Sequence, residues 1–362
     1  MNKLKLFLVG GFLGSGKTTA IEKAAKYLYH NNREVGVITN DQGTQQVDTL
    51  FISGQGIATE EVSGGCFCCN FEDLEGKIES LKREATPDVI FAESVGSCTD
   101  LAATVINPLL RLKPDQFEIV LSVFADVRLL IIFLQKNKAI FYDNVNYIYE
   151  KQLQEADIIV VNKIDLLTDE QLKVARKMIA TAFENKIILY QNSLLEDSVT
   201  QWLSICNGLQ NSLIRPSLEI DYDIYGAGEA ELAWLDEEIQ IVTKDKSAAT
   251  VGSVLMENIY NKILENNHSI GHLKYLIRDG KEKRKISFNA IPHESNADLN
   301  FFETNNVSVL INARVQVLPV LLKKIVADAV AETKLASKCR MIRKSMSAFK
   351  PGYPRPTHRI PV

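Results

Sequence analysis

A glycine-rich loop carrying a lysine and hydroxyl residues lies near the start of the chain. Residues 11–18, Gly-Phe-Leu-Gly-Ser-Gly-Lys-Thr, match the pattern G-x-x-x-x-G-K-[ST] in full. Glycines let the backbone curl so that its N–H groups face phosphate oxygens, while the lysine charge suits β- and γ-phosphates and the threonine hydroxyl suits Mg²⁺. We therefore predict a nucleotide phosphate site that comprises Gly11, Gly14, Ser15, Gly16, Lys17, Thr18 and Thr19, with Lys17 catalytic and Thr18 a ligand of Mg²⁺.

A second motif points to the base of the nucleotide. Asn162-Lys163-Ile164-Asp165 follows the buried apolar run Asp157–Val161. An aspartate at this position can accept two hydrogen bonds from the ring N–H and the exocyclic amine of guanine, which adenine does not offer. The stem of Lys163 can lie across the base, and Asn162 can tie this loop to the phosphate loop. We predict guanine specificity, with Asn192-Ser193 as a weaker candidate for closing over the base or, equally, an ordinary turn.

Two acidic residues follow other apolar runs. Glu93 ends the run Asp88–Ala92 and stands three residues before Gly96, while Asp41 follows the run Glu34–Thr39. In nucleotide hydrolases an acid here helps to hold Mg²⁺ and the γ-phosphate. We predict Glu93 and Asp41 as catalytic residues and the Gly96 N–H as a γ-phosphate donor; the alternative for each acid is a helix cap or a solvated loop charge.

Three thiols crowd into the segment Gly64-Gly65-Cys66-Phe67-Cys68-Cys69-Asn70. Cys66 and Cys69 have the C-x-x-C spacing of a metal knuckle, and Cys68 adds a third ligand if the loop curls. Soft thiolates favour Zn²⁺, Cu⁺ or similar ions. We predict a metal site whose fourth ligand the sequence does not identify; a redox dithiol or inert buried cysteines are the alternatives.

Other cysteines and histidines are expected to be structural. Cys98, Cys206 and Cys339 are isolated in the sequence, so we expect them to pack as small apolar residues. His268 and His272 are four residues apart, but His272 begins a predicted strand, which argues against a helical chelating pair.

Predicted strands and helices alternate along the first part of the chain, and they position these residues. Most of the apolar runs are continuous, as in strands buried on both faces, and helical spacing occurs between them, for example Phe71, Leu74, Ile78 and Leu81. We predict an α/β fold, a P-loop NTPase domain over residues 1–215 with a mainly parallel sheet flanked by helices. The predicted strands are Leu4–Val9, Glu34–Thr39, Asp88–Ala92, Phe117–Phe124, Asp157–Val161 and Lys186–Tyr190.

The pattern changes after Arg215-Pro216. Apolar and polar residues alternate over Val307–Val317, which is typical of antiparallel strands with one wet face. We predict a smaller α+β C-terminal domain over residues 216–335. Residues 336–362 are basic and contain prolines, so we expect a mobile or surface-draped tail.

Composition limits the class of protein. The 362 residues are 46% hydrophobic and 24% charged with a net charge of −4, which gives no reason to expect nucleic acid or an anionic membrane as a partner. No apolar run approaches about 18 residues, and glycines interrupt the N-terminal one, so neither a membrane span nor a signal peptide is expected. The clustered thiols favour a reducing cytoplasm.

The segments Gly11–Thr19, Gly64–Asn70, Glu93–Gly96 and Gln152–Asp165 resemble those of the CobW-type metallochaperone GTPases, relatives of the GTPases that mature urease and hydrogenase. The likeness covers roughly the first 215 residues. It implies a GTPase that binds a transition metal, Zn²⁺ ahead of Co²⁺ or other ions, at Cys66, Cys68 and Cys69. It further implies GTP/GDP and Mg²⁺ as cofactors, an unidentified client metalloprotein as partner, and room for a nucleotide- or metal-dependent dimer.

These expectations combine into a switch hypothesis. Thr18, with Asp41 or Glu93, holds Mg²⁺ against GTP, and the γ-phosphate orders the loops that begin near Asn40 and Glu93. The cysteine loop lies between those loops in sequence, so metal and GTP would change each other's affinity by the same factor. No water-positioning glutamine or arginine finger can be assigned, so we expect slow hydrolysis without metal or client. The alternatives are a GTP-regulated metal-buffering or sensing module and a phosphotransferase.

Overall fold

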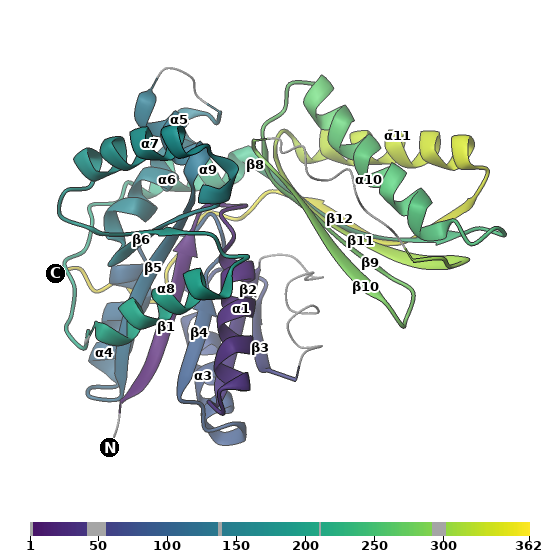
Figure 1. Ribbon diagram of the computed structural model, residues 1–362. Helices are drawn as coiled ribbons and strands as arrows, with labels where there is room; N and C mark the ends of the chain where they lie inside the picture. Colours follow the sequence, from purple (N-terminus) through teal and green to yellow (C-terminus); the bar gives the residue numbers. More distant parts are fainter. Residues whose placement is uncertain (1–2, 42–55, 137–139, 210, 292–301) are drawn as a thin grey trace. The chain divides into compact units, whose positions relative to one another are not determined.

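The computed structural model describes residues 3–41, 56–136, 140–209, 211–291 and 302–362 (Figure 1). These residues form two compact units. The described residues up to 228, together with 353–362, make the first unit, and residues 229–352 make the second. The predicted α/β architecture with an additional α+β unit is thus confirmed.

The first unit is built on a seven-stranded sheet in the order β3-β2-β4-β1-β5-β6-β7. Every neighbouring pair of strands is parallel. The inner strands consist mostly of apolar residues, which is why they lie buried on both faces. The strands are β1 (Leu4–Gly11), β2 (Val35–Asp41), β3 (Ala58–Ser63), β4 (Val89–Glu93), β5 (Phe117–Asp126), β6 (Ile158–Asn162) and β7 (Ile187–Gln191).

Helices follow the strands, as the alternating pattern predicts. Strand β3 is the one strand of this sheet, within the described residues, that has no counterpart among the predicted strands, because its residues Ala58–Ser63 are mostly polar. The helices are α1 (Lys17–His30), α3 (Phe71–Glu84), a π-helix η1 (Ala102–Ile106), α4 (Asn107–Leu112), α5 (Val127–Gln135), α6 (Asp143–Glu155), a 3-10 turn η2 (Ile164–Leu166), α7 (Asp169–Ala182), α8 (Glu196–Gly208) and α9 (Tyr222–Glu231).

The two faces of the sheet pack against different helices. Apolar residues of α1 and α8, with Trp202 at the centre, cover the face to which Phe7 and Phe91 belong. On the opposite face, Leu81 of α3 contacts Gly36, and Leu101 before η1 contacts Gly10. Packing on both faces fixes the positions of the strands. The loops that follow the strands are therefore held along one edge of the sheet.

The segment after β4 is fastened to α6. The Gln152 amide donates to the carbonyl oxygens of Gly96 (3.0 Å) and Cys98 (2.8 Å). The Glu155 carboxyl group accepts from the Thr99 hydroxyl (3.1 Å) and the Ala102 N–H (3.2 Å). Two buried polar side chains on one helix thus satisfy a buried irregular loop.

The boundary of the first unit lies later than the predicted residue 215. Arg215 is buried, exchanges hydrogen bonds with Asn107 and pairs with Asp157 at 3.0 Å. Its burial keeps the chain on the first unit beyond Pro216, and the division falls after Gly228 within α9.

The second unit is a five-stranded antiparallel sheet in the order β10-β9-β11-β8-β12, with two helices on one face (Figure 1). Its last strand runs through residues predicted to begin a tail, because β12 pairs with β8 along most of its length. Its elements are β8 (Leu232–Val242), α10 (Ala248–Glu265), β9 (Ile270–Arg278), β10 (Lys283–Asn289), β11 (Asn306–Gln316), α11 (Pro319–Ser337) and β12 (Arg340–Phe349). None of the helices in the described residues has the length and hydropathy needed to span a bilayer.

The buried Glu155 carboxyl makes stability depend on pH. Burial raises its pKa to about 8, and the nearby Asp100 charge adds to the rise. The native protein therefore holds a proton that the unfolded chain releases near pH 4.5, so this group lowers the free energy of unfolding by about 1.4 kcal/mol per pH unit as pH rises from about 5 to 8.

Glu155→Gln keeps an acceptor for Ala102 and should flatten this slope in urea denaturation at pH 5, 6.5 and 8. Glu150→Gln, on the exposed side of the same helix, is the control; equal slopes for the wild type and Glu155→Gln would contradict the assignment.

Candidate functional site

Left-handed glycines shape the loop between β1 and α1. Gly11 has φ 121° and Gly16 has φ 94°, a region that other residues rarely adopt. A Cβ on Gly11 would lie 2.2 Å from the Phe124 carbonyl oxygen, and one on Gly16 would lie 2.3 Å from the Asn162 side-chain nitrogen. The loop is therefore pressed against the ends of β5 and β6, and Thr19 continues it into the first turn of α1.

The basic and hydroxyl side chains of this loop are buried. Lys17 Nζ donates to the carbonyl oxygens of Gly11 (2.7 Å) and Phe12 (3.3 Å). Thr18 Oγ1 donates to Glu93 Oε1 at 2.9 Å. The structure thus brings together the predicted Thr18 and Glu93, although they are 75 positions apart in the sequence.

The oxygen donors fit a hard cation. The hydroxyl of Thr18 and the carboxylate of Glu93 lie side by side, and oxygen ligands of this kind are what Mg²⁺ prefers. The Ser15 hydroxyl is buried without a hydrogen-bond partner among the described residues, in the loop predicted to cradle phosphate. A buried donor of this kind is costly unless a ligand satisfies it.

Asn162 joins three loops. Its Nδ2 donates to the Ser15 carbonyl oxygen at 2.8 Å, which confirms the predicted tie to the phosphate loop. Its Oδ1 accepts from both the N–H (3.1 Å) and the hydroxyl (2.9 Å) of Ser193. The loops after β1, β6 and β7 therefore share one buried amide.

Lys163 is held by Asp126, a residue for which no role was predicted. Its Nζ donates to the Gly14 carbonyl oxygen (2.6 Å) and to Asp126 Oδ2 (2.9 Å). Burial raises the pKa of Asp126, but the charges of Lys163 and Arg128 outweigh this effect and hold the pKa below its usual range. Asp126 ends the buried strand β5, the same pattern that identified Glu93, so this signal was present in the sequence.

The remaining predicted nucleotide residues lie at the same edge of the sheet. Asp165 is exposed in η2, and the Asn192 side chain accepts from the Leu194 N–H at 2.9 Å, as in a local turn. A Cβ on Gly96 would meet Leu13, so the loop after β4 contacts the phosphate loop. Asp41 is the last residue of β2, and its side chain lies outside the described part of the chain.

The three clustered thiols converge in the loop between β3 and α3. Cys66 Sγ lies 2.9 Å from Cys68 Sγ and 3.3 Å from Cys69 Sγ, and the third separation is 3.8 Å. Backbone N–H groups of Cys69 and Asn70 both donate to the Cys66 carbonyl oxygen at 3.0 Å, which curls the loop as predicted. Three sulfurs this close suit a soft or borderline metal ion.

Hydrogen bonding sets the order in which these thiols ionise. Hydrogen bonding with the thiols of Cys68 and Cys69 lowers the pKa of Cys66 well below its usual value. The same contact with Cys66 raises the pKa of Cys68 and brings that of Cys69 to about 11. Deprotonation therefore begins at Cys66, the sulfur central to the group, and a bound cation would favour the remaining steps.

Asn40 anchors the cysteine loop to β2. Its Oδ1 accepts from the Phe67 N–H (3.0 Å), and its Nδ2 donates to the carbonyl oxygens of Val62 (3.0 Å) and Gly65 (2.7 Å). The predicted role of Asn40 was only to start a loop. An asparagine at the end of a buried strand is the one signal that points to it.

Two residues of the segment 353–362, Arg355 and Thr357, contact the cysteine loop. The Thr357 N–H donates to the Cys68 carbonyl oxygen (2.8 Å), and the Thr357 hydroxyl donates to the Cys69 carbonyl oxygen (3.0 Å). The Arg355 N–H donates to Cys69 Sγ at 3.3 Å, and Arg359 pairs with Asp100 at 2.7 Å. This part of the expected tail is packed by specific hydrogen bonds on the first unit.

The other cysteines and histidines divide into two groups. Cys98 is fully buried and contributes to the lowered pKa of Cys66. Cys206, a residue of α8, packs in the core of the first unit, and Cys339 packs against the core of the second unit, as expected. His272 lies in strand β9, in agreement with its predicted place in a strand.

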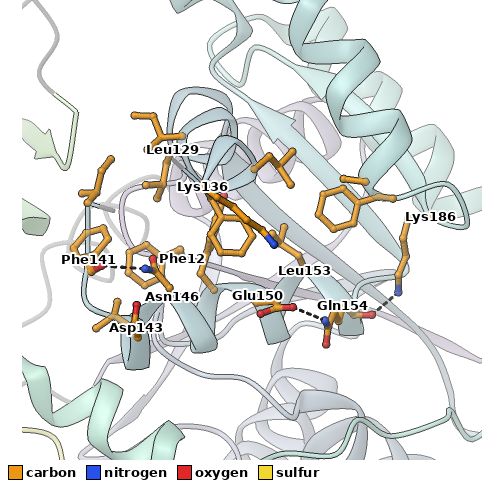
Figure 2. Close-up of a pocket in the computed structure, with 18 of the residues that line it drawn as sticks. Phe12, Leu129, Lys136, Phe141, Asp143, Asn146, Glu150, Leu153, Gln154 and Lys186 are labelled. Carbon is orange, nitrogen blue, oxygen red and sulfur yellow. Dashed lines mark hydrogen bonds between the residues drawn. The ribbon is translucent and has the colours of Figure 1, made fainter. Parts of the chain in front are cut away.

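A separate cavity of about 800 Å³ lies between α5, α6 and the turn after α7 (Figure 2). Phe12 and Leu153 contribute apolar lining, and Glu150 and Lys186 are at its polar side. Among the described residues, none of those predicted to hold nucleotide or metal lines this cavity.

Curated relatives match the chain over part of its length. It is 34% identical over 172 residues to the "Zinc chaperone YeiR" of Escherichia coli, a match that covers 45% of this chain and 47% of that protein. It is 28% identical over 209 residues to the "Zinc chaperone CobW" of a Sinorhizobium species, covering 51% and 57%. The chain thus spans about half the length of these relatives.

A solved structure, of HypB from Helicobacter pylori in complex with nickel, resembles the chain with a TM-score of 0.43 and 16% identity, covering 60% of this chain and 92% of that one. The model of the family "CobW/HypB/UreG, nucleotide-binding domain" matches residues 5–189, just over half of the chain. With the phosphate loop, the Asn162 tie and the cysteine loop in place, the chain belongs to the CobW/HypB/UreG family of P-loop GTPases.

Proposed function

We propose that this chain binds and hydrolyses GTP, carries a transition metal at Cys66, Cys68 and Cys69, and couples its nucleotide state to transfer of that metal to a client protein. The observation that carries the proposal is the convergence of three thiols within 4.8 Å of one another in a loop anchored to the nucleotide-side edge of the sheet. The zinc chaperones among the relatives support Zn²⁺ as the cargo. Three adjacent thiols support the reducing cytoplasm as the compartment.

Nucleotide binding follows from the residues of the phosphate loop. Lys17 exchanges its carbonyl partners for β- and γ-phosphate oxygens, and the Ser15 hydroxyl and the loop N–H groups supply further donors. Asp165, exposed in η2, accepts from the guanine ring, while Asn162 holds that loop against the phosphates. Thr18 and Glu93, with Asp41 as a further candidate, hold Mg²⁺, which neutralises phosphate charge. Unaided hydrolysis is slow, and metal or client accelerates it.

Coupling requires that the two sites share structure. The loop after β4 begins at Glu93, which bonds Thr18, and it reaches Leu13 through Gly96. Asn40, at the end of β2, holds the cysteine loop. Ordering of these strand ends by the γ-phosphate therefore changes the positions of the thiols, and hydrolysis releases the ion.

The coupling is measured by titrating Co²⁺ into the protein bound to GDP or to a non-hydrolysable GTP analogue. We expect the two affinities to differ by about 1–3 kcal/mol, or roughly 5- to 150-fold. The affinity for the analogue must change by the same factor when metal is present. Equal metal affinities in both states would exclude coupled delivery and leave a buffering module.

Asp165→Asn tests guanine recognition. Loss of the carboxylate removes two charge-assisted hydrogen bonds, so we expect GTP affinity to fall by about 3 kcal/mol, roughly a hundredfold, in equilibrium binding. Xanthosine triphosphate should bind the variant better than GTP, because its second ring carbonyl accepts from the new amide. Asp169→Asn, an exposed acid in the first turn of α7, is the control. Unchanged GTP affinity would place base recognition elsewhere.

Asn40→Ala tests the anchor of the cysteine loop. It leaves the buried Phe67 N–H and the Gly65 carbonyl without their partner, so we expect the free energy of unfolding to fall by about 1–3 kcal/mol and Zn²⁺ affinity to fall. Asn70→Ala removes a weaker, exposed bond to Ser63 (3.3 Å) and serves as the control. Unchanged Zn²⁺ affinity, measured by competition with a chelator, would show that the anchor does not position the thiols.

A further inference from the structure

We propose that the segment Tyr353–Val362, which we call the strap, is part of the metal site: it holds the Cys69 thiol in place and ties it to the loop after β4. Its positioning residues are Thr357, which bonds the backbone of the cysteine loop, and Arg359, which bonds the loop after β4. The strap thereby slows release of the ion and makes that release depend on the bound nucleotide. This inference rests on the proposed metal site and extends it to residues about 286 positions further along the chain.

The strap crosses the cysteine loop through three hydrogen bonds, which is the first observation. The Arg355 N–H donates to Cys69 Sγ (3.3 Å), the Thr357 N–H donates to the Cys68 carbonyl oxygen (2.8 Å), and the Thr357 hydroxyl donates to the Cys69 carbonyl oxygen (3.0 Å). Cys69 is half-buried, whereas Cys66 and Cys68 are buried. The strap therefore bonds the most accessible of the three sulfurs, the one that an incoming ligand reaches first.

Contacts on both sides of this crossing fix the strap to the first unit, which is the second observation. The Tyr353 hydroxyl donates to Asp223 Oδ1 (3.0 Å) before the crossing, and the Ile360 N–H donates to the Ala103 carbonyl oxygen (2.8 Å) after it. Prolines precede and follow Arg355, and each proline fixes its own φ angle. The strap therefore loses little conformational entropy when it lies on the loop.

Arg359 joins the strap to the loop after β4, which is the third observation. Its Nε donates to Asp100 Oδ2 (2.7 Å), an oxygen that also accepts from the Tyr222 hydroxyl (2.7 Å). The Asp100 side chain is buried, and its φ of 65° is left-handed, a conformation that only contacts of this kind maintain outside glycine. The same loop begins at Glu93, which bonds Thr18. Direct contacts thus lead from the phosphate loop to the strap.

This arrangement gives the nucleotide a route to one particular thiol. A change in the loop after β4 on nucleotide exchange moves Asp100, and the pair with Arg359 carries the movement to Thr357, two residues away in the strap. The strap then tightens or loosens on Cys69. Cys69 is accordingly the first sulfur to leave the ion, and its departure requires the strap to loosen.

The test compares Thr357→Val, which removes the hydroxyl donor at nearly constant shape, with Thr357→Ser, which keeps that donor. Each full-length variant is loaded with Zn²⁺, and release of the ion to an excess of chelator is timed with GDP and with a non-hydrolysable GTP analogue. We expect Thr357→Val to release Zn²⁺ about two- to tenfold faster than the wild type, and Thr357→Ser to match the wild type. Thr200→Val, which removes a hydroxyl bond to the Asp197 carbonyl oxygen (2.9 Å) in α8, is the control.

Arg359→Gln tests the tie to Asp100. It removes the ion pair but leaves the bonds between the strap and the cysteine loop, so the ratio between the release rates in the two nucleotide states should fall towards one by at least about threefold. Arg33→Gln, which removes an exposed pair with Asp88 (3.3 Å), is the control. An unchanged ratio in Arg359→Gln would overturn the link to the nucleotide.

A measurement on the metal-free protein separates this proposal from the proposed function. Hydrogen–deuterium exchange reports the amides of residues 66–70 and 353–362, which we expect to exchange faster in Thr357→Val than in the wild type. Unchanged release of Zn²⁺ from folded Thr357→Val overturns the proposal whether or not exchange is faster, while the metal site stands if Cys66→Ser loses the ion. If the wild type binds no Zn²⁺, the metal site itself fails. Faster exchange and faster release, with unchanged circular dichroism, are the expected result.

Discussion

The common direction of β2, β4, β1, β5 and β6 is the constraint on which the site depends. Parallel strands deliver all their carboxyl ends to one edge, so the loops that follow them meet although they are distant in sequence. At that edge Thr18 meets Glu93, and Asn162 meets Ser15. The continuous apolar strands buried between α1, α8 and α3 hold the edge in place, and the polar contacts then fix the loops upon it.

Polar groups near this edge are buried and matched in charge. Lys163 lies between a carbonyl oxygen and Asp126, and the carboxylate remains ionised despite its burial because two basic groups face it. The clustered thiols differ from Asp126. Within the described residues no basic side chain bonds their sulfurs, and the thiols hydrogen-bond one another instead. The phosphate-loop side of the site is thus suited to an anionic ligand, and the cysteine loop is suited to a cation.

Local patterns account for most of what the sequence could predict. The phosphate loop and the Asn162 motif are short, and each contains its own strand and turn signals, so the fold and the tie between them follow from the residues. Asn40 and Asp126 were missed because their roles arise from contacts across the sheet edge that no periodicity records. Strand β12 was missed because a basic, proline-flanked segment resembles a tail until β8 is available as its partner.

The segment on the cysteine loop has a consequence for the order of assembly during synthesis. Arg355 and Cys69 are 286 positions apart, so the ribosome completes the cysteine loop long before it makes the C-terminal segment that contacts this loop. Until then the Cys69 sulfur lacks its donor, the Arg355 N–H, and the carbonyl oxygens of Cys68 and Cys69 lack the hydrogen bonds from Thr357. A nascent chain therefore presents these thiols in a more open setting than the finished protein does.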